Sequence, residues 1–140
     1  MVEKLLGHWK LESSENFDEY MKAMKVNIVL RKIGNSITSY FEICKDGDTW
    51  TLHITSTFKN QTLVFKLGEP VDETTLDGRK CKSTFTVEGN VLAQQQDAVN
   101  SSDTSSKYEY EVREDGKLYL TCISVPTNVV STRIFLPYTP

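Results

Sequence analysis

From residue 37 onward, apolar and polar residues alternate with a period of two along most of the chain. Phe41 and Ile43, for example, lie between polar neighbours shortly before the Asp46-Gly47 pair. A period of two is typical of strands with one buried face, and Asp-Gly supplies the positive φ that tight hairpin turns require. Further turn signals follow at intervals of about 8 to 15 residues, so the pattern predicts about ten strands in antiparallel arrangement.

A different spacing precedes these strands. Residues 16–34 repeat apolar side chains at helical intervals, which predicts two short amphipathic helices directly after a first strand. Asn16 is a favourable N-cap for the first helix, and Asp18 and Glu19 lie in its first turn, where the helix dipole favours acids. Asn27 is a candidate cap for the second helix. The apolar positions of the pair are Phe17, Tyr20, Met21, Met24, Ile28, Val29 and Ile33.

A long antiparallel run of strands usually closes on itself, because closure removes the exposed edges of the sheet. A barrel of about eight or more strands has room inside for a small ligand, and two helices after the first strand would cover one open end. The chain of 140 residues is long enough for one domain with a sizeable core. We therefore expect an all-β fold with a single domain over residues 1–140, an up-and-down antiparallel β-barrel (a clam) with a helix-turn-helix lid.

Charge and composition restrict the class of function. Sixteen Lys and Arg residues against nineteen Asp and Glu residues give a net charge of −3, whereas proteins that bind nucleic acid rely on a basic excess. No apolar run approaches the roughly 18 residues of a membrane span, and no stretch resembles a signal peptide. Cys44, Cys81 and Cys122 are widely spaced, unlike a disulfide framework or a metal site. These features predict a reduced, cytoplasmic protein that binds neither nucleic acid nor metal.

Three stretches resemble the cytosolic fatty-acid-binding protein family, which belongs to the intracellular lipid-binding proteins. They are Gly7-x-Trp9-x-Leu11 followed by Asn16-Phe17-Asp18-x-Tyr20, the middle segment 56–83, and the closing STRIF of residues 131–135. The resemblance covers nearly the whole chain and implies a ten-stranded barrel with a helix-turn-helix lid. It also implies a monomeric carrier without enzymatic activity or cofactor. Such a carrier binds one long-chain fatty acid or related lipid and delivers it between membranes or to protein partners.

The resemblance also assigns residues to the ligand. The cavity wall would include Phe17, Tyr20, Met21, Ile54, Ser56, Gln96, Leu120 and Cys122. Of these, Ser56 and Gln96 would help to orient the polar end of the lipid. The portal through which the lipid enters would be formed by Val26, Val29 and Ile33 on the lid, Phe58 at one hairpin turn, and Leu76 and Asp77 at another.

The head-group site departs from the family pattern. Family members typically hold a carboxylate with two arginines and a tyrosine, and the last strand supplies one arginine and the tyrosine as Arg-x-Tyr. Here Arg133 is present, but Phe135 replaces the tyrosine. Counting back from Asp115 without gaps places Glu111 at the position of the other arginine. An inward Glu111 would pair with Arg133 and repel a fatty-acid carboxylate.

Three interpretations of this departure stay open. In the first, the cavity binds fatty acids with Arg133 as an anchor of weak head-group specificity. In the second, it prefers a neutral, hydroxylated or retinoid-like lipid. In the third, the strand is shifted by one residue, so that Tyr108 and Tyr110 point inward and Glu111 points outward, since a one-residue slip inverts the faces of a strand.

Two further hypotheses concern partners. Lys22, Arg31 and Lys32 on the lid form a basic patch that would bring the portal to anionic membranes, where each basic residue contributes roughly 1 kcal/mol. The simpler interpretation of these residues is ordinary solubilising charge. A competing function for the whole chain is a ligand-free interaction module, whose barrel is filled by its own side chains.

Overall fold

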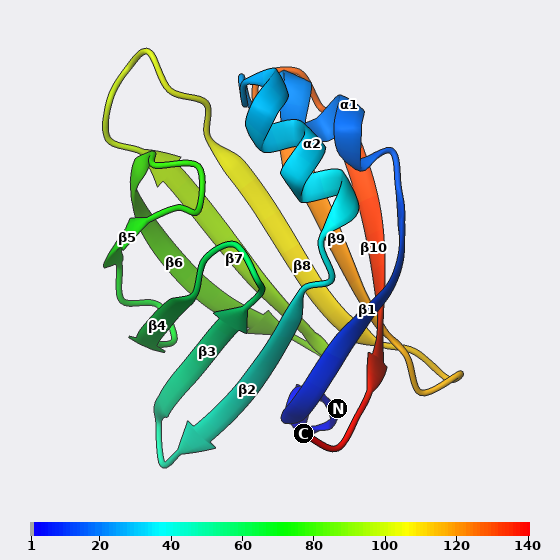
Figure 1. The fold of residues 1–140 in the computed structure, drawn as a ribbon. Coiled ribbons are helices and arrows are strands. Elements are labelled where there is room, and N and C mark those ends of the chain that lie inside the picture. Colours follow the sequence, from blue (N-terminus) through cyan, green and yellow to red (C-terminus); the bar gives the residue numbers. More distant parts are fainter. Residues whose placement is uncertain (1) are drawn as a thin grey trace.

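Ten antiparallel strands form one continuous sheet in the computed structural model, which describes residues 2–140 (Figure 1). The strand order is β4-β3-β2-β1-β10-β9-β8-β7-β6-β5, so every pair of strands adjacent in sequence is hydrogen-bonded except β4 and β5. The expected all-β barrel with a helical lid is confirmed. The elements are η1 (Val2–Leu5), β1 (Gly7–Glu15), α1 (Phe17–Ala23), α2 (Ile28–Ser36), β2 (Tyr40–Asp46), β3 (Thr49–Thr55), β4 (Gln61–Lys66), β5 (Val71–Thr74), β6 (Lys80–Glu88), β7 (Val91–Ala98), β8 (Ser106–Val112), β9 (Leu118–Ser124) and β10 (Val130–Pro137).

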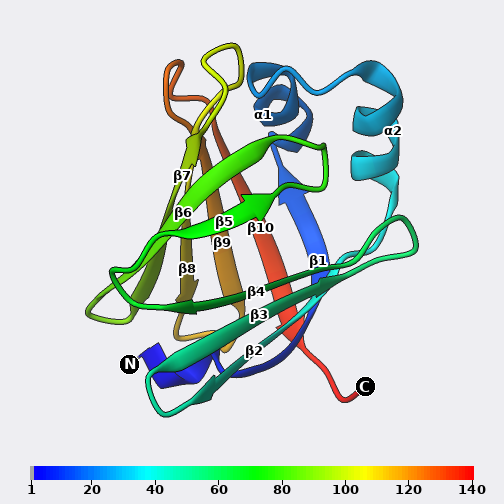
Figure 2. The same cartoon turned by 90° about the vertical axis from the view of Figure 1, so that its left-hand side faces the viewer.

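The barrel is nearly closed and stays open between β4 and β5, the two edges of the sheet. No strand ladder joins these edges within residues 2–140, and Figure 2 shows both on the same side of the barrel. The side chain of Gln61 on β4 crosses the opening. Its Nε2 donates to the Thr74 carbonyl and to a carboxylate oxygen of Glu73, both on β5 and both at 2.9 Å. A side-chain amide thus replaces the backbone ladder at this point.

The helices α1 and α2 cover one end of the barrel (Figures 1 and 2). Asn27 caps α2 as predicted, since its Oδ1 accepts a hydrogen bond from Leu30 N at 3.0 Å. Asn16 occupies the N-cap position of α1 but makes no side-chain capping bond. It instead donates from Nδ2 to the Val130 carbonyl at 2.9 Å, which fastens the lid to β10. No helix within residues 2–140 is long and apolar enough to cross a membrane.

Close packing occurs at both ends of the barrel. At the lid, a Cβ atom on Gly34 would lie 2.8 Å from Met21 Sδ, so the Met21 side chain packs directly against the backbone of α2 at this glycine. At the other end lies η1 (Figure 1), whose Leu5 is fully buried and accepts a hydrogen bond from Trp9 Nε1 at 2.8 Å. The space between the two ends is only partly filled by side chains, which leaves a cavity under the lid.

Candidate functional site

A cavity of about 220 Å³ lies between the lid and the inner face of the sheet. Its wall is mostly apolar, and its polar side chains are grouped at a few places. The lid contributes Phe17, Tyr20, Met21, Met24, Val26, Leu30, Ile33 and Gly34. The strands and turns contribute Ile37, Ser39, Leu52, Ile54, Phe58, Gln61, Leu63, Glu73, Thr75, Leu76, Asp77, Arg79, Gln94, Gln96, Tyr108, Tyr110, Leu120, Cys122, Arg133 and Phe135.

Most residues that the sequence assigns to the cavity lie in its wall. They are Phe17, Tyr20, Met21, Ile54, Gln96, Leu120, Cys122, Arg133 and Phe135. Ser56 does not line the cavity. It lies in the turn between β3 and β4, where its Oγ accepts hydrogen bonds from Phe58 N at 3.1 Å and Lys59 N at 3.2 Å. Ser56 therefore stabilises a turn near the portal rather than the cavity wall.

Glu111 points away from the cavity. Its carboxylate pairs with Arg113 Nε at 3.1 Å on the outer surface, whereas the adjacent Tyr110 is buried and lines the cavity. The expectation that Glu111 faces Arg133 is thus corrected, and the shifted register of β8 is the one that the structure has. The turn after β8 contains three residues rather than two, so the count back from Asp115 is out of phase by one.

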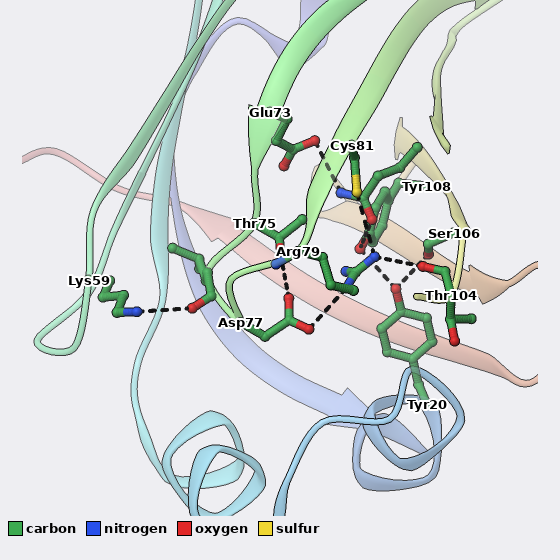
Figure 3. Close-up of polar contacts among 12 residues, drawn as sticks. Tyr20, Lys59, Glu73, Thr75, Asp77, Arg79, Cys81, Thr104, Ser106 and Tyr108 are labelled. Atoms are coloured by element: carbon green, nitrogen blue, oxygen red, sulfur yellow. Dashed lines mark hydrogen bonds and ion pairs between the residues drawn. The ribbon is translucent and has the colours of Figure 1, made fainter. Parts of the chain in front are cut away.

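The residues expected at the portal line the cavity, with one exception. Val26, Ile33, Phe58, Leu76 and Asp77 contribute to the wall. Val29 is 64% exposed and lies on the outer face of α2. The two portal turns contact each other, because Lys59 Nζ donates to the Leu76 carbonyl at 3.4 Å (Figure 3).

Glu73 is a buried carboxylate that the sequence analysis did not identify. One oxygen accepts hydrogen bonds from Ser83 Oγ at 2.6 Å and from the Nε2 atoms of Gln94 and Gln96, each at 3.1 Å. The other accepts from Gln61 Nε2 at 2.9 Å. Four neutral donors from three other strands therefore satisfy this carboxylate. One signal in the sequence pointed to this network. Gln94 and Gln96 alternate in step with the apolar Leu92 of β7, which indicates that these polar side chains point inward.

Tyrosine hydroxyls continue this network toward the lid. Tyr108 on β8 donates to Gln96 Oε1 at 3.4 Å, and Tyr20 on α1 donates to the Tyr108 hydroxyl at 2.8 Å (Figure 3). The Tyr20 hydroxyl also bonds Ser106 Oγ at 2.6 Å. Burial raises the pKa of Tyr108 to about 12 and raises the pKa of Tyr20 further. Both phenols are therefore protonated hydrogen-bond donors at neutral pH.

Arg133 has a different environment. Its Cζ lies 4.0 Å from the centre of the Phe17 ring, and its Nε donates to Ser14 Oγ at 3.0 Å. Neither terminal amino group has a hydrogen-bond partner among residues 2–140, and no carboxylate in that part of the chain lies within ion-pair distance. Burial lowers the pKa of Arg133 because it disfavours the charged form. The cavity thus contains one cation without an acidic partner.

A second arginine of the cavity wall is already paired. Arg79 is 8% exposed, and its Nε donates to Asp77 Oδ2 at 2.9 Å while Nη1 donates to the Thr104 carbonyl at 2.8 Å (Figure 3). Burial acts to lower the pKa of Arg79, but the Asp77 carboxylate outweighs burial and raises it. Arg79 therefore ties the portal turn to the loop before β8, and its charge is balanced within the chain.

The chain as a whole matches a family of lipid-binding carriers. A sequence model described as the lipocalin / cytosolic fatty-acid binding protein family matches residues 6–130. The chain belongs to this family.

Individual relatives match over almost their full length. Sodium/calcium exchanger regulatory protein 1 of Doryteuthis pealeii is 43% identical over 96% of this chain and 97% of its own. Human fatty acid-binding protein 9 is 39% identical over 96% of this chain and 98% of its own. Among solved structures, a Schistosoma mansoni fatty acid binding protein in complex with arachidonic acid is 34% identical. Its TM-score is 0.89, with 99% of this chain and 98% of that chain covered.

Proposed function

We propose that this protein is a cytosolic carrier that holds one long-chain fatty acid in the barrel, with the carboxylate at Arg133. The observation that carries the proposal is a cation without an acidic partner among the described residues, in the wall of a mostly apolar cavity. Arg133 is half-buried, and a partly desolvated charge without an opposite charge costs free energy. A carboxylate would supply that charge, and its two oxygens match the planar donor groups of a guanidinium. The acyl chain would contribute about 0.8 kcal/mol for each buried methylene.

The comparisons support the same ligand class. One relative is named for fatty acids, and one solved neighbour holds arachidonic acid. The outward position of Glu111 also removes the repulsion that favoured a neutral lipid. The alternative of an interaction module filled by its own side chains agrees less well with an apolar cavity of about 220 Å³, although one relative is named as a regulator of an exchanger.

The test compares oleic acid with methyl oleate, which has the same chain and no charge. Arg133→Met should weaken binding of the acid about 10- to 100-fold and leave the ester nearly unchanged, because hydrogen bonds to charged groups contribute about 1.5–3 kcal/mol. Arg113→Met is the matched control, since Arg113 lies outside the barrel and pairs with Glu111. Equal losses for acid and ester would contradict the proposed anchor. Binding of neither lipid by the wild type would contradict the carrier function.

Contact with anionic membranes is a further part of the proposal, and the charges of the lid limit it. Lys22 pairs with Asp18 and Glu19, and Arg31 pairs with Asp18. Lys32 is exposed and forms no ion pair within residues 2–140. We therefore expect Lys32 to carry most of the attraction, with the exposed apolar side chains of α2 entering the lipid surface. Lys32→Glu should slow fatty-acid transfer to vesicles that contain phosphatidylserine and leave transfer to neutral vesicles unchanged. Equal rates for both proteins would remove this part of the proposal.

A further inference from the structure

We propose that the hydroxyls of Tyr108 and Tyr20 complete the carboxylate site with Arg133, so that head-group binding holds α1 on the barrel. This inference rests on the proposed function and names the residues that replace the missing parts of the family site. The resemblance expects a hydroxyl at position 135 and a second cation at position 111. The structure has Phe135 at the first position and an outward Glu111 at the second.

Strand pairing places the Tyr108 and Arg133 side chains on the same inner face of the sheet, two strands apart and offset by two residues along the strands. On β8, Tyr108 lies opposite Cys122 of β9, and Cys122 lies opposite Ser131 of β10. Arg133 is two residues beyond Ser131 and therefore on the same inner face. Neighbouring strands are about 4.8 Å apart, so the long side chains of Tyr108 and Arg133 can extend toward each other across the cavity, whose wall both line.

Aromatic contacts connect Arg133 to helix α1 of the lid. The guanidinium lies over the Phe17 ring, and the Phe17 and Tyr20 rings stack with centroids 6.0 Å apart. The Tyr20 hydroxyl then bonds the Tyr108 hydroxyl at 2.8 Å. A continuous chain of contacts thus runs along the cavity wall from the Arg133 guanidinium through the Phe17 ring to Tyr20 and Tyr108.

The Tyr108 hydroxyl has donor capacity that its present acceptor uses poorly. Tyr108 donates to Gln96 Oε1 at 3.4 Å, which is long for an O–H···O bond. A carboxylate oxygen is a stronger acceptor than an amide oxygen, and bonds to it are shorter. A carboxylate beside Arg133 would therefore accept the hydrogen bond of Tyr108 in place of Gln96, which keeps its bond to Glu73. The Tyr20 hydroxyl would donate to the same carboxylate instead of to the Tyr108 oxygen, since the carboxylate is the stronger acceptor.

Tyr20 gives this site a consequence for the lid. It belongs to α1, which spans only Phe17–Ala23, whereas Arg133 and Tyr108 belong to the barrel. A carboxylate bound to all three connects the lid to two strands through a charged group. A neutral ester occupies the same cavity without making this connection.

The experiment measures oleic acid and methyl oleate binding to Tyr108→Phe, Tyr20→Phe and Tyr119→Phe. Each of the first two variants should bind the acid about ten-fold more weakly, because each removes one hydrogen bond to a charged group. Their affinity for the ester should not change, which also checks that the cavity is intact. Tyr119 is the comparator, since its hydroxyl donates to Asp115 Oδ2 at 2.6 Å in an exposed contact and its side chain does not line the cavity. Tyr119→Phe should keep the wild-type ratio of acid to ester affinity.

Hydrogen exchange of the α1 amides tests the connection to the lid. Oleic acid should slow exchange in α1 more than methyl oleate does, and Tyr20→Phe should remove this difference. Equal exchange with acid and ester in the wild type would overturn the inference, as would an unchanged acid-to-ester ratio in Tyr108→Phe and Tyr20→Phe. With either of these results, tight binding of oleic acid by the wild type would still support the proposed carrier function. Absence of any acid binding would contradict the carrier function itself.

Discussion

Glu73 and Arg133 are charged side chains in the wall of the same cavity, but the chain satisfies only one of them. Glu73 is 7% exposed and accepts four hydrogen bonds from neutral donors of neighbouring strands. Arg133 has one hydroxyl partner and two neighbouring aromatic rings, and its terminal amino groups have no hydrogen-bond partner among the described residues.

The difference separates a charge that supports the fold from a charge that is available to a ligand. The donors around Glu73 come from β4, β6 and β7, and the bond from Gln61 on β4 joins the two edges of the open barrel. Removing their acceptor would leave buried donors without partners, which costs free energy. Removing Arg133 would instead relieve the desolvation of a lone cation. Loss of the Glu73 carboxylate should therefore lower the stability of the fold. Loss of the Arg133 charge should weaken fatty-acid binding without lowering stability.

The largest effect is expected for Glu73→Leu. The donors of Ser83, Gln94 and Gln96 would lose a common acceptor, so we expect the free energy of unfolding to fall by about 3 kcal/mol. Urea denaturation followed by tryptophan fluorescence measures this loss. Glu73→Gln keeps an acceptor oxygen and should lose less. A loss below about 0.5 kcal/mol for Glu73→Leu, typical of surface positions, would show that the network does not support the fold.

A smaller effect of opposite sign is expected for Arg133→Met without lipid. Methionine has a similar length and no charge to desolvate, so the free energy of unfolding should stay the same or rise by up to about 1 kcal/mol. The same urea titration measures it, with Arg79→Met as the contrast. Arg79 is tied to Asp77 and Thr104, and its loss should destabilise the protein. A clear destabilisation by Arg133→Met would mean that Arg133 is part of the fold rather than an open site.

The smallest effect is expected for Glu111→Gln. Its carboxylate lies outside the barrel and pairs with Arg113, and exposed ion pairs contribute about 0–1 kcal/mol. Oleic acid affinity should therefore be unchanged, as measured by displacement of a fluorescent fatty-acid probe. Tighter binding in Glu111→Gln would instead indicate that Glu111 acts on the cavity.

The sequence predicted the architecture because its signals are local. Period-two alternation, hairpin turns and the helical spacing of residues 16–34 each depend on neighbours within a few positions. The cap of α2 by Asn27 is equally local and is confirmed. Asn16 shows the limit of such signals, since its side chain bonds Val130 on a strand more than a hundred residues away.

The phase of β8 depends on one detail of its turn. Arg113 N bonds the Lys117 carbonyl at 3.1 Å, and Gly116 adopts a φ of 76°. This geometry encloses Glu114, Asp115 and Gly116 in a three-residue turn, whereas an Asp-Gly pair alone favours two residues. One extra residue inverts every side chain of the strand. The alternation of Tyr108 and Tyr110 predicted correctly which residues of β8 point inward. The count back from Asp115, which placed Glu111 inward, was wrong.

The Glu73 network could not be located from sequence alone. Its members are Gln61, Glu73, Ser83, Gln94 and Gln96, and they meet only because β4 to β7 lie around the open side of the barrel. A sequence shows that polar residues occupy inward positions of a strand. It does not show which charge they surround, because that depends on the register of several strand pairs.

The most direct test of the contrast between Glu73 and Arg133 is a pH titration of bound oleic acid that carries ¹³C at its carboxyl carbon. An open cation favours the ionised acid, so the bound carboxylate should titrate about 1 to 3 pH units lower in the wild type than in Arg133→Met. The sign follows from the attraction between the two charges, which lowers the pKa of the acid. A bound acid that titrates at the same pH in both proteins would contradict the assignment of Arg133 as the carboxylate site.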